Sequence, residues 1–273
     1  MSKEKPDNSN AKEVKYIKTE VFLTFDLETI PREYDSFSES QQEYIVRYTK
    51  DEEDAEQKKA QMALSPLTAK LVVIGMQLDE VEVLKNTETN AEVLKITNTT
   101  KFSYILDESK EEGEIDEDKL STGDGCKYMN EKTMLEQFWN IFKKNKYRNV
   151  HLISFNGRNF DAPFIMLRSA LLGIRPTRNI MEGTKFNYPL HTDLIDELCF
   201  FAPSAYGATK RFNFDFYARE FGLQSPKAEG IDGSKVKDFF LDGKVNEVAE
   251  YCMRDVTTTW KLYLIWRERL KFK

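Results

Sequence analysis

Two acidic residues, separated by a single leucine within an apolar run, form the first candidate pair in this sequence for metal binding or catalysis. The run VFLTFDLETI, Val21 to Ile30, is rich in apolar, β-branched and aromatic residues, which predicts a strand buried on both faces. Since side chains alternate along a strand, Asp26 and Glu28 share one face, about 6.6 Å apart along the strand. Burying both is costly without cations, and carboxylate oxygens are ligands that Mg²⁺ and Mn²⁺ prefer. Taken alone, the pair could equally be the solvated end of a strand.

A third acid follows a second apolar run, VHLISFN at 150–156, which also predicts a buried strand. The loop from Asn156 to Phe160 then leads to Asp161, just before a helix that starts with Pro163. We expect Asp161 to be the N-cap of that helix, with proline at N2. Capping alone would explain the residue. The functional alternative is that the strand end is where open α/β sheets bind ligands, so that this carboxylate could face the first two.

The last predicted helix, about 245–270, carries a fourth acid. Its apolar stripe consists of Val245, Val248, Ala249, Cys252 and Val256. Tyr251 and Asp255 lie beside this stripe at positions i and i+4, so they point the same way. A surface pair, or a hydrogen-bonded pair at the edge of the core, is the alternative explanation.

The remaining pattern predicts the elements that must position these groups. Strands are expected at 70–80, 81–85, 91–97, 101–106 and near 190–194, with antiparallel hairpins among the first four. Helices are expected over 38–63, from 130, and over 163–172 and 214–220, the first opened by Ser38 with Gln41 at capping-box spacing. This order predicts one α/β domain over 16–273 after a disordered tail of residues 1–15. The acidic segment 107–120 is expected to be an exposed hairpin or loop.

Composition and charge limit how the protein could bind nucleic acid, what its cysteines could do and where it is located. The chain has 273 residues, 40% of them hydrophobic, and a net charge of −6, so no basic coat is available to hold nucleic acid by phosphate neutralisation alone. Segment 107–120 has eight acids against two lysines, which leaves the rest of the chain neutral overall. The three cysteines, far apart, suggest neither disulfides nor zinc. A polar N-terminus and the absence of long apolar runs favour a cytoplasmic protein.

Together the three acidic elements resemble the DEDD 3′-5′ exonucleases of the ribonuclease H-like superfamily. The resemblance rests on Asp26-Leu-Glu28, on Asn156-xxx-Phe160-Asp161 and on Tyr251-xxx-Asp255, whose tyrosine is typical of the DEDDy branch. Within that branch, FNGRNFDAPFI, HTDLIDEL, KAEGIDGSKV and EYCMRDVTTTWKLY look most like stand-alone proteins related to the proofreading domain of family B DNA polymerases. The similarity spans roughly residues 20 to 268.

The resemblance implies a ribonuclease H-like α/β fold with a mixed, mainly five-stranded central sheet flanked by helices. It implies that Asp26, Glu28, Asp161 and Asp255 hold two divalent cations, Mg²⁺ or Mn²⁺, for in-line attack of water on a phosphodiester. Tyr251 would orient that water, because a phenol with a pKa near 10 is a poor base at neutral pH.

Other residues are weaker candidates. Asn156 and Arg158 could contact the terminal nucleotide or its phosphate, and Phe160 could stack on the terminal base, although a turn, a solvated charge and a core position explain them as well. His191 is interpreted as structural, and Asp193 and Asp196 as supporting or surface acids. Possible phosphate-tracking cations are Arg168, Arg175, Arg178, Lys185, Lys210 and Arg211.

The sequence therefore predicts a metal-dependent 3′-5′ exonuclease that acts on 3′ ends of single-stranded DNA in repair or replication, with a polymerase or repair complex as the kind of partner expected. Two alternatives stay open. The same acids could cleave RNA, because they cannot sense a 2′-hydroxyl. Alternatively, the chain could be a nucleic-acid-binding module without catalysis.

Overall fold

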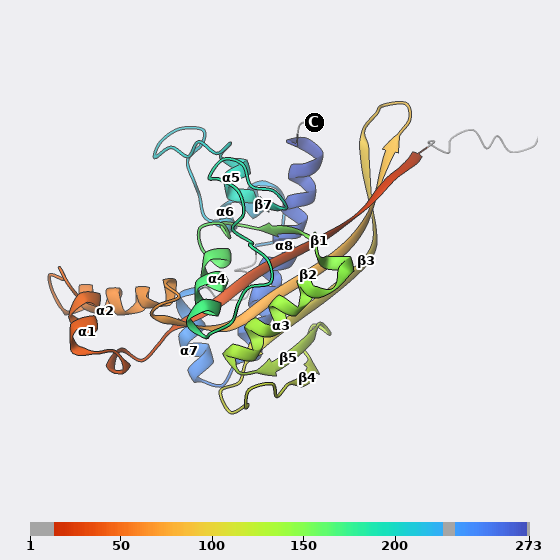
Figure 1. The fold of residues 1–273 in the computed structure, drawn as a ribbon. Helices are drawn as coiled ribbons and strands as arrows, with labels where there is room; N and C mark the ends of the chain where they lie inside the picture. Colours follow the sequence, from red (N-terminus) through yellow and green to blue (C-terminus); the bar gives the residue numbers. More distant parts are fainter. Residues whose placement is uncertain (1–13, 226–232, 272–273) are drawn as a thin grey trace, which may run out of the picture.

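A seven-stranded mixed sheet runs through the molecule in the computed structural model, which describes residues 14–225 and 233–271 (Figure 1). The strand order is β4-β5-β3-β2-β1-β6-β7. The strands are β1 (Val14–Pro31), β2 (Ala69–Asn86), β3 (Glu92–Leu106), β4 (Asp116–Lys119), β5 (Gly125–Met129), β6 (His151–Ser154) and β7 (His191–Asp193). Pairs β1·β2, β2·β3 and β4·β5 are antiparallel, whereas β3·β5, β1·β6 and β6·β7 are parallel. The sheet is mixed, as expected, but it has seven strands instead of about five, partly because the acidic segment supplies β4.

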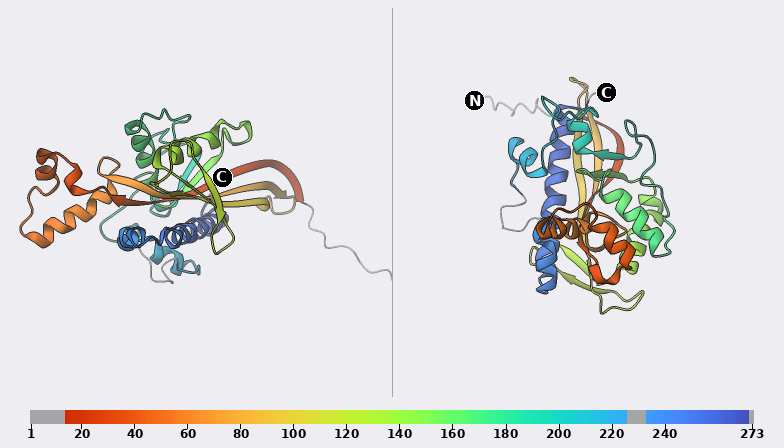
Figure 2. Two further views of the ribbon diagram at one scale, coloured as in Figure 1. Left: turned by 90° about the horizontal axis from the view of Figure 1, so that it is seen from below. Right: turned by 90° about the vertical axis from the view of Figure 1, so that its left-hand side faces the viewer.

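Helices cover both faces of this sheet. The helices are α1 (Glu39–Ile45), α2 (Glu52–Gln61), α3 (Glu131–Lys143), α4 (Asp161–Leu171), α5 (Leu194–Leu198), α6 (Phe214–Glu220), α7 (Val236–Leu241) and α8 (Val245–Arg269). Short 3₁₀ turns are η1 (Tyr34–Ser36), η2 (Met62–Leu64), η3 (Asn145–Tyr147) and η5 (Gly233–Lys235). Seen along the sheet edge, α3 and α4 lie on one face and α7 and α8 on the other (Figure 2). Within the described residues, no helix is long and apolar enough to cross a membrane.

Strands β2 and β3 are continuous where the sequence suggested breaks. Runs 70–80 and 81–85 form the single strand β2, and 91–97 and 101–106 form β3. Buried Asp79, near the expected break, accepts hydrogen bonds from Gln77 Nε2 (2.8 Å) and Thr99 Oγ1 (2.5 Å). Because its carboxylate is satisfied inside the sheet, a polar residue here does not end the strand.

The expected helical region 38–63 is wrong as a single element. It forms α1 and α2 instead, in an arm that projects from the end of β1 and β2 (Figure 1). The break has a local cause, since Asp51 accepts a hydrogen bond from Asp54 N at 2.9 Å and starts a new helix. The expected pairing of Gln41 with the Ser38 N–H is present at 3.0 Å.

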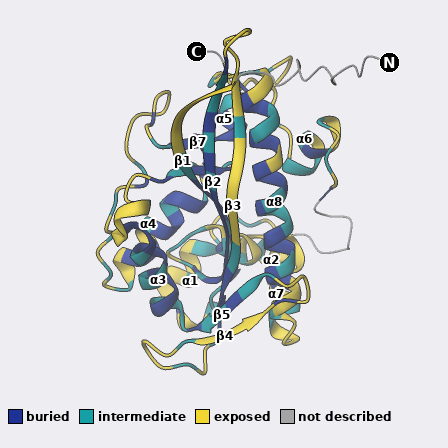
Figure 3. Cartoon of the chain, turned by 90° about the vertical axis from the view of Figure 1, so that its right-hand side faces the viewer, coloured by how far each residue is buried: buried dark blue, intermediate teal, exposed yellow. Residues whose placement is uncertain are grey.

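The core lies between the sheet and its two helical layers. Phe138 and Trp139 of α3 are buried against the sheet on one face, and Val248, Cys252 and Val256 of α8 on the other. Figure 3 shows the contrast between buried β2 and the exposed hairpin end of β3. The expected tail, 1–15, lies mostly outside the described residues, and β1 already begins at Val14.

Candidate active site

Asp26 and Glu28 lie on β1 and approach the first half of α8. Oxygen atoms of the two carboxylates and Cys252 Sγ all lie within 4.8 Å of one another. The Cys252 thiol is 3.5 Å from the Asp26 carbonyl oxygen and 3.7 Å from Asp26 Oδ2. Cys252 belongs to the predicted apolar stripe of this helix, and that spacing gave no sign of its contact with the acids.

Gly75 explains why α8 can approach β1 and β2 so closely. This glycine is the β2 partner of Asp26 in the antiparallel register. A Cβ at Gly75 would lie 2.7 Å from Cys252 Sγ and 3.2 Å from a methyl group of Val256. Larger residues would push the helix away from the sheet. A glycine inside a strand is a known sign of close approach by another element, and this signal in KLVVIGMQ could have located the packing of α8.

Tyr251 and Asp255 lie one turn apart on α8, as their spacing predicted. Tyr251 donates a side-chain hydrogen bond to Asp255. Burial raises the pKa of Tyr251 above its ordinary value, and the charges of Asp255, Glu28 and Asp26 raise it further. The phenol is therefore protonated at neutral pH and can act as a hydrogen-bond donor.

Asp161 begins α4, but it is not the N-cap that the sequence suggested. Phe160 occupies the N-cap position, and Asp161 is the first helical residue. Its side chain is 3% exposed, and its Oδ1 atom has no hydrogen-bond partner among the described residues. Burial raises the pKa of Asp161 to about 7, and the charges of Asp193 and Asp255 add to the effect. A bound cation would satisfy a buried carboxylate oxygen that has no hydrogen-bond partner.

The acids also perturb one another. Burial is the largest cause that raises the pKa of Asp26 and of Glu28 well above their ordinary values. The charges of Asp161 and Asp255 raise the pKa of both groups further, so these four carboxyls share one electrostatic environment. Within 14–225 and 233–271, no ion pair reaches Asp26, Glu28 or Asp161. This donor set of hard oxygen atoms fits divalent cations such as Mg²⁺ or Mn²⁺.

The cluster has a buried side and an accessible side. Glu28, Asp161 and Tyr251 are buried, whereas Asp26 and Asp255 are partly exposed. A ligand that reaches the acids from solvent would therefore meet Asp26 and Asp255 first.

Asp193 positions the loop that leads to Asp161. This buried carboxylate accepts hydrogen bonds from the backbone N–H groups of Asn156 (2.7 Å) and Arg158 (2.8 Å). Gly157 lies between them, and a Cβ there would be 2.3 Å from Ser154 Oγ and 3.2 Å from Asp161 Oδ2. Asp193 is thus a supporting acid, and not a surface one.

The three weaker substrate-binding candidates lie in this loop with contacts of their own. Asn156 has a φ of 67° and its amide oxygen accepts a hydrogen bond from Asn159 at 3.0 Å. The Arg158 guanidinium lies 4.2 Å from the Tyr188 ring centre and donates to the Glu182 carbonyl at 3.2 Å. Phe160 packs on Phe164 with ring centres 5.7 Å apart.

Several basic side chains that were expected to contact phosphates form hydrogen bonds or ion pairs within the protein instead. Arg168 is buried and its Nη2 is 2.6 Å from Glu131 Oε2. Arg178 donates to the Val150 carbonyl at 2.7 Å, and Arg211 pairs with Asp196. Arg175, Lys185 and Lys210 are exposed. His191 is buried beside Ser154 Oγ (2.8 Å), and burial lowers its pKa to about 3, which agrees with a structural role.

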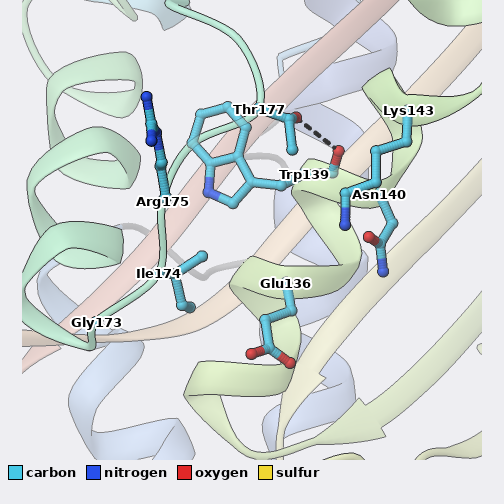
Figure 4. A pocket seen from close by; sticks show the side chains of 8 residues that line it. All are labelled: Glu136, Trp139, Asn140, Lys143, Gly173, Ile174, Arg175 and Thr177. Atoms are coloured by element: carbon cyan, nitrogen blue, oxygen red, sulfur yellow. Dashed lines mark hydrogen bonds between the residues drawn. The ribbon is translucent and has the colours of Figure 1, made fainter.

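A separate hollow of about 320 Å³ lies between α3 and the segment after α4 (Figure 4). Lys143 and Arg175 line it, and the Thr177 hydroxyl donates to the Trp139 carbonyl at 3.0 Å along one wall. None of the acids described above lines this hollow.

The chain belongs to a family of predicted 3′-5′ exonucleases related to the exonuclease domain of PolB, whose model matches residues 101–270. The matched range contains Asp161, Tyr251 and Asp255, whereas Asp26 and Glu28 precede it. Exonuclease domains of this kind use divalent metals. In sequence, no curated protein matches the chain.

Among the solved structures that the chain resembles are a DNA polymerase and an exonuclease. The family B DNA polymerase from the archaeon Pyrobaculum calidifontis matches with a TM-score of 0.50 and 15% identity, over 90% of this chain and 24% of the polymerase. Exonuclease I from E. coli, in complex with a dT13 oligonucleotide, matches with a TM-score of 0.39 and 14% identity, over 92% of this chain and 41% of that protein. The chain thus spans about a quarter of the polymerase, whose likeness supports the exonuclease fold.

Proposed function

We propose that this chain is a metal-dependent exonuclease that removes nucleoside monophosphates from the 3′ ends of single-stranded DNA. The observation that carries the proposal is the convergence of four carboxyls and a tyrosine from β1, α4 and α8. The pKa values of Asp26, Glu28, Asp161 and Tyr251 are raised, and none of the first three has a cationic partner among the described residues. Such an arrangement costs folding free energy, so a role in binding cations explains why the fold contains it.

Asp26, Glu28, Asp161 and Asp255 would hold two divalent cations, Mg²⁺ or Mn²⁺. When bound, these ions would supply Lewis acidity for the attacking water and the leaving 3′ oxygen. The partly exposed Asp26 and Asp255 lie where a terminal phosphate could arrive from solvent. Buried Glu28 and Asp161 would fix the inner part of the site.

Tyr251 would position the attacking water by hydrogen bonding. Its raised pKa keeps the phenol protonated at neutral pH, so it cannot serve as the base. The hydrogen bond to Asp255 holds the ring in one orientation. This is the DEDDy arrangement, with the tyrosine as a positioning residue.

The loop residues Asn156, Arg158 and Phe160 would contact the terminal nucleotide. Of the three, Asn156 and Phe160 are the stronger candidates, because the Arg158 guanidinium already contacts Tyr188 and the Glu182 carbonyl. We also propose that residues 16–273 act as one exonuclease domain, in DNA repair or replication, since α8 packs on β1, β2, β3 and β6 of a single sheet.

A cleavage ladder tests the proposal. Single-stranded DNA and RNA labelled at the 5′ end are incubated with Mg²⁺, Mn²⁺ or EDTA, with wild-type protein and with Asp26→Ala. A metal-dependent ladder that shortens from the 3′ end of DNA, absent in the variant, is expected. Cleavage of RNA alone would replace DNA by RNA as substrate, and absence of products on both would favour a binding module.

A further inference from the structure

The helical arm, residues 32–68, contains a second hollow that lies away from the acids. Its volume is about 680 Å³, and its walls include Tyr44, Arg47 and Tyr48 from α1 and the turn after it, together with Lys58 and Met62. The arm precedes residues 101–270, which the exonuclease family model matches. Neither the acids nor the loop before Asp161 contributes to this hollow.

Two tyrosines in the hollow present their rings to solvent. Tyr48 is 88% exposed and Tyr44 is 61% exposed. The Arg47 guanidinium lies 3.7 Å from the Tyr44 ring centre and donates a hydrogen bond to the Tyr44 hydroxyl at 2.8 Å. Tyr48 has a φ of 63°, a left-handed conformation that is unfavourable for a bulky residue. Residues in such conformations cluster at active sites and at segments that clamp ligands.

The charges of the arm are segregated. Residues 32–68 contain nine acids and five bases, so the arm as a whole is acidic. The lining of the hollow nevertheless includes two cations, Arg47 and Lys58, and no acid. Positive groups interleaved with exposed aromatic rings suit a ligand that carries both phosphates and flat bases.

The base of the arm is fixed to the residue that follows Glu28. Thr29 Oγ1 donates a hydrogen bond to the Ala63 carbonyl in η2 at 2.7 Å, and Met62 beside it lines the hollow. Arg32 N donates to the Thr68 carbonyl at 2.9 Å and closes the base from the other side. The upstream nucleotides of a single-stranded nucleic acid whose 3′ end lies at the acids would therefore be within reach of the arm.

We propose that the arm binds the upstream part of the single-stranded nucleic acid whose 3′ end occupies the acidic site, an inference that rests on the proposed function. Tyr44 and Tyr48 stack on bases, and Arg47 and Lys58 contact phosphates. The arm then supplies affinity for long strands and leaves the chemistry at the acids unchanged.

Binding without cleavage tests this inference. The affinity of full-length protein for a fluorescently labelled oligothymidylate is measured by anisotropy in EDTA, so that no metal supports hydrolysis. The test variant is Tyr44→Ala/Tyr48→Asn, because asparagine accepts the left-handed backbone that Tyr48 adopts. We expect its affinity to fall by about tenfold or more, as for the loss of stacked bases elsewhere. Tyr16→Ala, an exposed tyrosine at the opposite end of β1, is the matched control and is expected to bind like wild type.

A second readout separates this inference from the proposed function. With Mg²⁺ or Mn²⁺, the double variant is expected to hydrolyse a dinucleotide as fast as wild type, since a dinucleotide has only one nucleotide upstream of the terminal one. Equal oligothymidylate affinity of wild type and double variant would overturn the inference and leave the hollow as a surface for a protein partner. Lack of hydrolysis by wild type, together with the expected loss of affinity in the variant, would overturn the proposed function and support the arm.

Discussion

Acidic residues gather in two regions of this molecule, and their surroundings are opposite. In segment 107–120 the acids lie at the surface beside lysines. Lys110 Nζ is 2.6 Å from Asp116 Oδ2 and 3.0 Å from Glu114 Oε1, and Lys127 pairs with Glu117 at 2.5 Å. At the candidate site, Asp26, Glu28 and Asp161 have no such partner among the described residues, and burial raises their pKa values.

Charge density along the sequence therefore does not identify a functional acid. Eight acids in fourteen consecutive positions produce a solvated surface, because water and nearby lysines offset their repulsion. The four acids of the site are spread over more than two hundred residues of sequence and meet only in the fold. Burial without compensation is the feature that separates the second group from the first.

The largest expected effect is the loss of an acid from the site. Asp26→Ala and Asp255→Ala are each expected to lower kcat about 10³-fold or more, since a lost metal ligand removes several kcal/mol of stabilisation from the transition state. Steady-state kinetics on single-stranded DNA measure the effect. Asp118→Ala, which removes an exposed acid from β4, is the control and should retain wild-type turnover; near-normal turnover in either site variant would refute the assignment.

Metal binding at the acids of the candidate site should raise the free energy of unfolding of the protein. At about 100 times Kd, Mn²⁺ is expected to add about 2.7 kcal/mol to the free energy of unfolding and to raise Tm by roughly 5 to 10 °C. Asp26→Asn is expected to abolish this shift and to raise Tm of the metal-free protein, because it removes repulsion among buried carboxylates. Thermal melts with EDTA and with Mn²⁺ measure both. If Mn²⁺ raised the Tm of Asp26→Asn as much as that of wild type, the metal would bind elsewhere.

Tyr251→Phe should have a smaller effect than loss of an acid. The variant keeps the buried ring and loses only the hydroxyl, so kcat is expected to fall about ten- to a hundredfold, or about 1.4 to 2.7 kcal/mol. KM should change little. A variant as inactive as Asp26→Ala would show that the phenol does more than position water.

Buried His191 should make the free energy of unfolding depend on pH. Because burial lowers the pKa of His191 to about 3, the unfolded chain binds a proton that the folded protein does not bind between about pH 3 and 6.5. The free energy of unfolding should therefore fall with decreasing pH in this range, by up to about 1.4 kcal/mol per pH unit from this residue. Denaturant titrations at several pH values give the slope of the free energy of unfolding against pH. In His191→Asn this slope should be smaller by the equivalent of about one proton. An unchanged slope would contradict the lowered pKa.

The smallest effect is expected in the exposed acidic segment. Glu117→Gln removes one charge of a surface pair and should change the free energy of unfolding by less than about 1 kcal/mol, with activity unchanged. Chemical denaturation and the kinetic assay measure the two quantities. A large loss of activity would mean that this segment belongs to the substrate path.

Much of the fold could be predicted from local patterns. The helix that Asn130 caps is present, and Asn130 Oδ1 accepts from Thr133 N at 2.9 Å. Helix 214–220 has the expected bounds, and the final helix ends one residue earlier than expected. Predicted element boundaries were wrong where a contact between residues distant in sequence decided the structure. At Asp79, a hydrogen bond from Thr99 on β3 satisfies the carboxylate inside the sheet, so the strand continues.

Local spacing in the sequence is enough to predict which side chains of a single strand or helix point the same way. Strand alternation puts Asp26 and Glu28 on one face, and helical spacing puts Tyr251 and Asp255 on one face, because these relations depend only on backbone geometry. The distances between elements, in contrast, follow only from the folded structure. Close packing at Gly75 brings Cys252 to Asp26, and buried Asp193 holds the loop that delivers Asp161. Such distances depend on the packing of residues far apart in sequence, which no local spacing can encode.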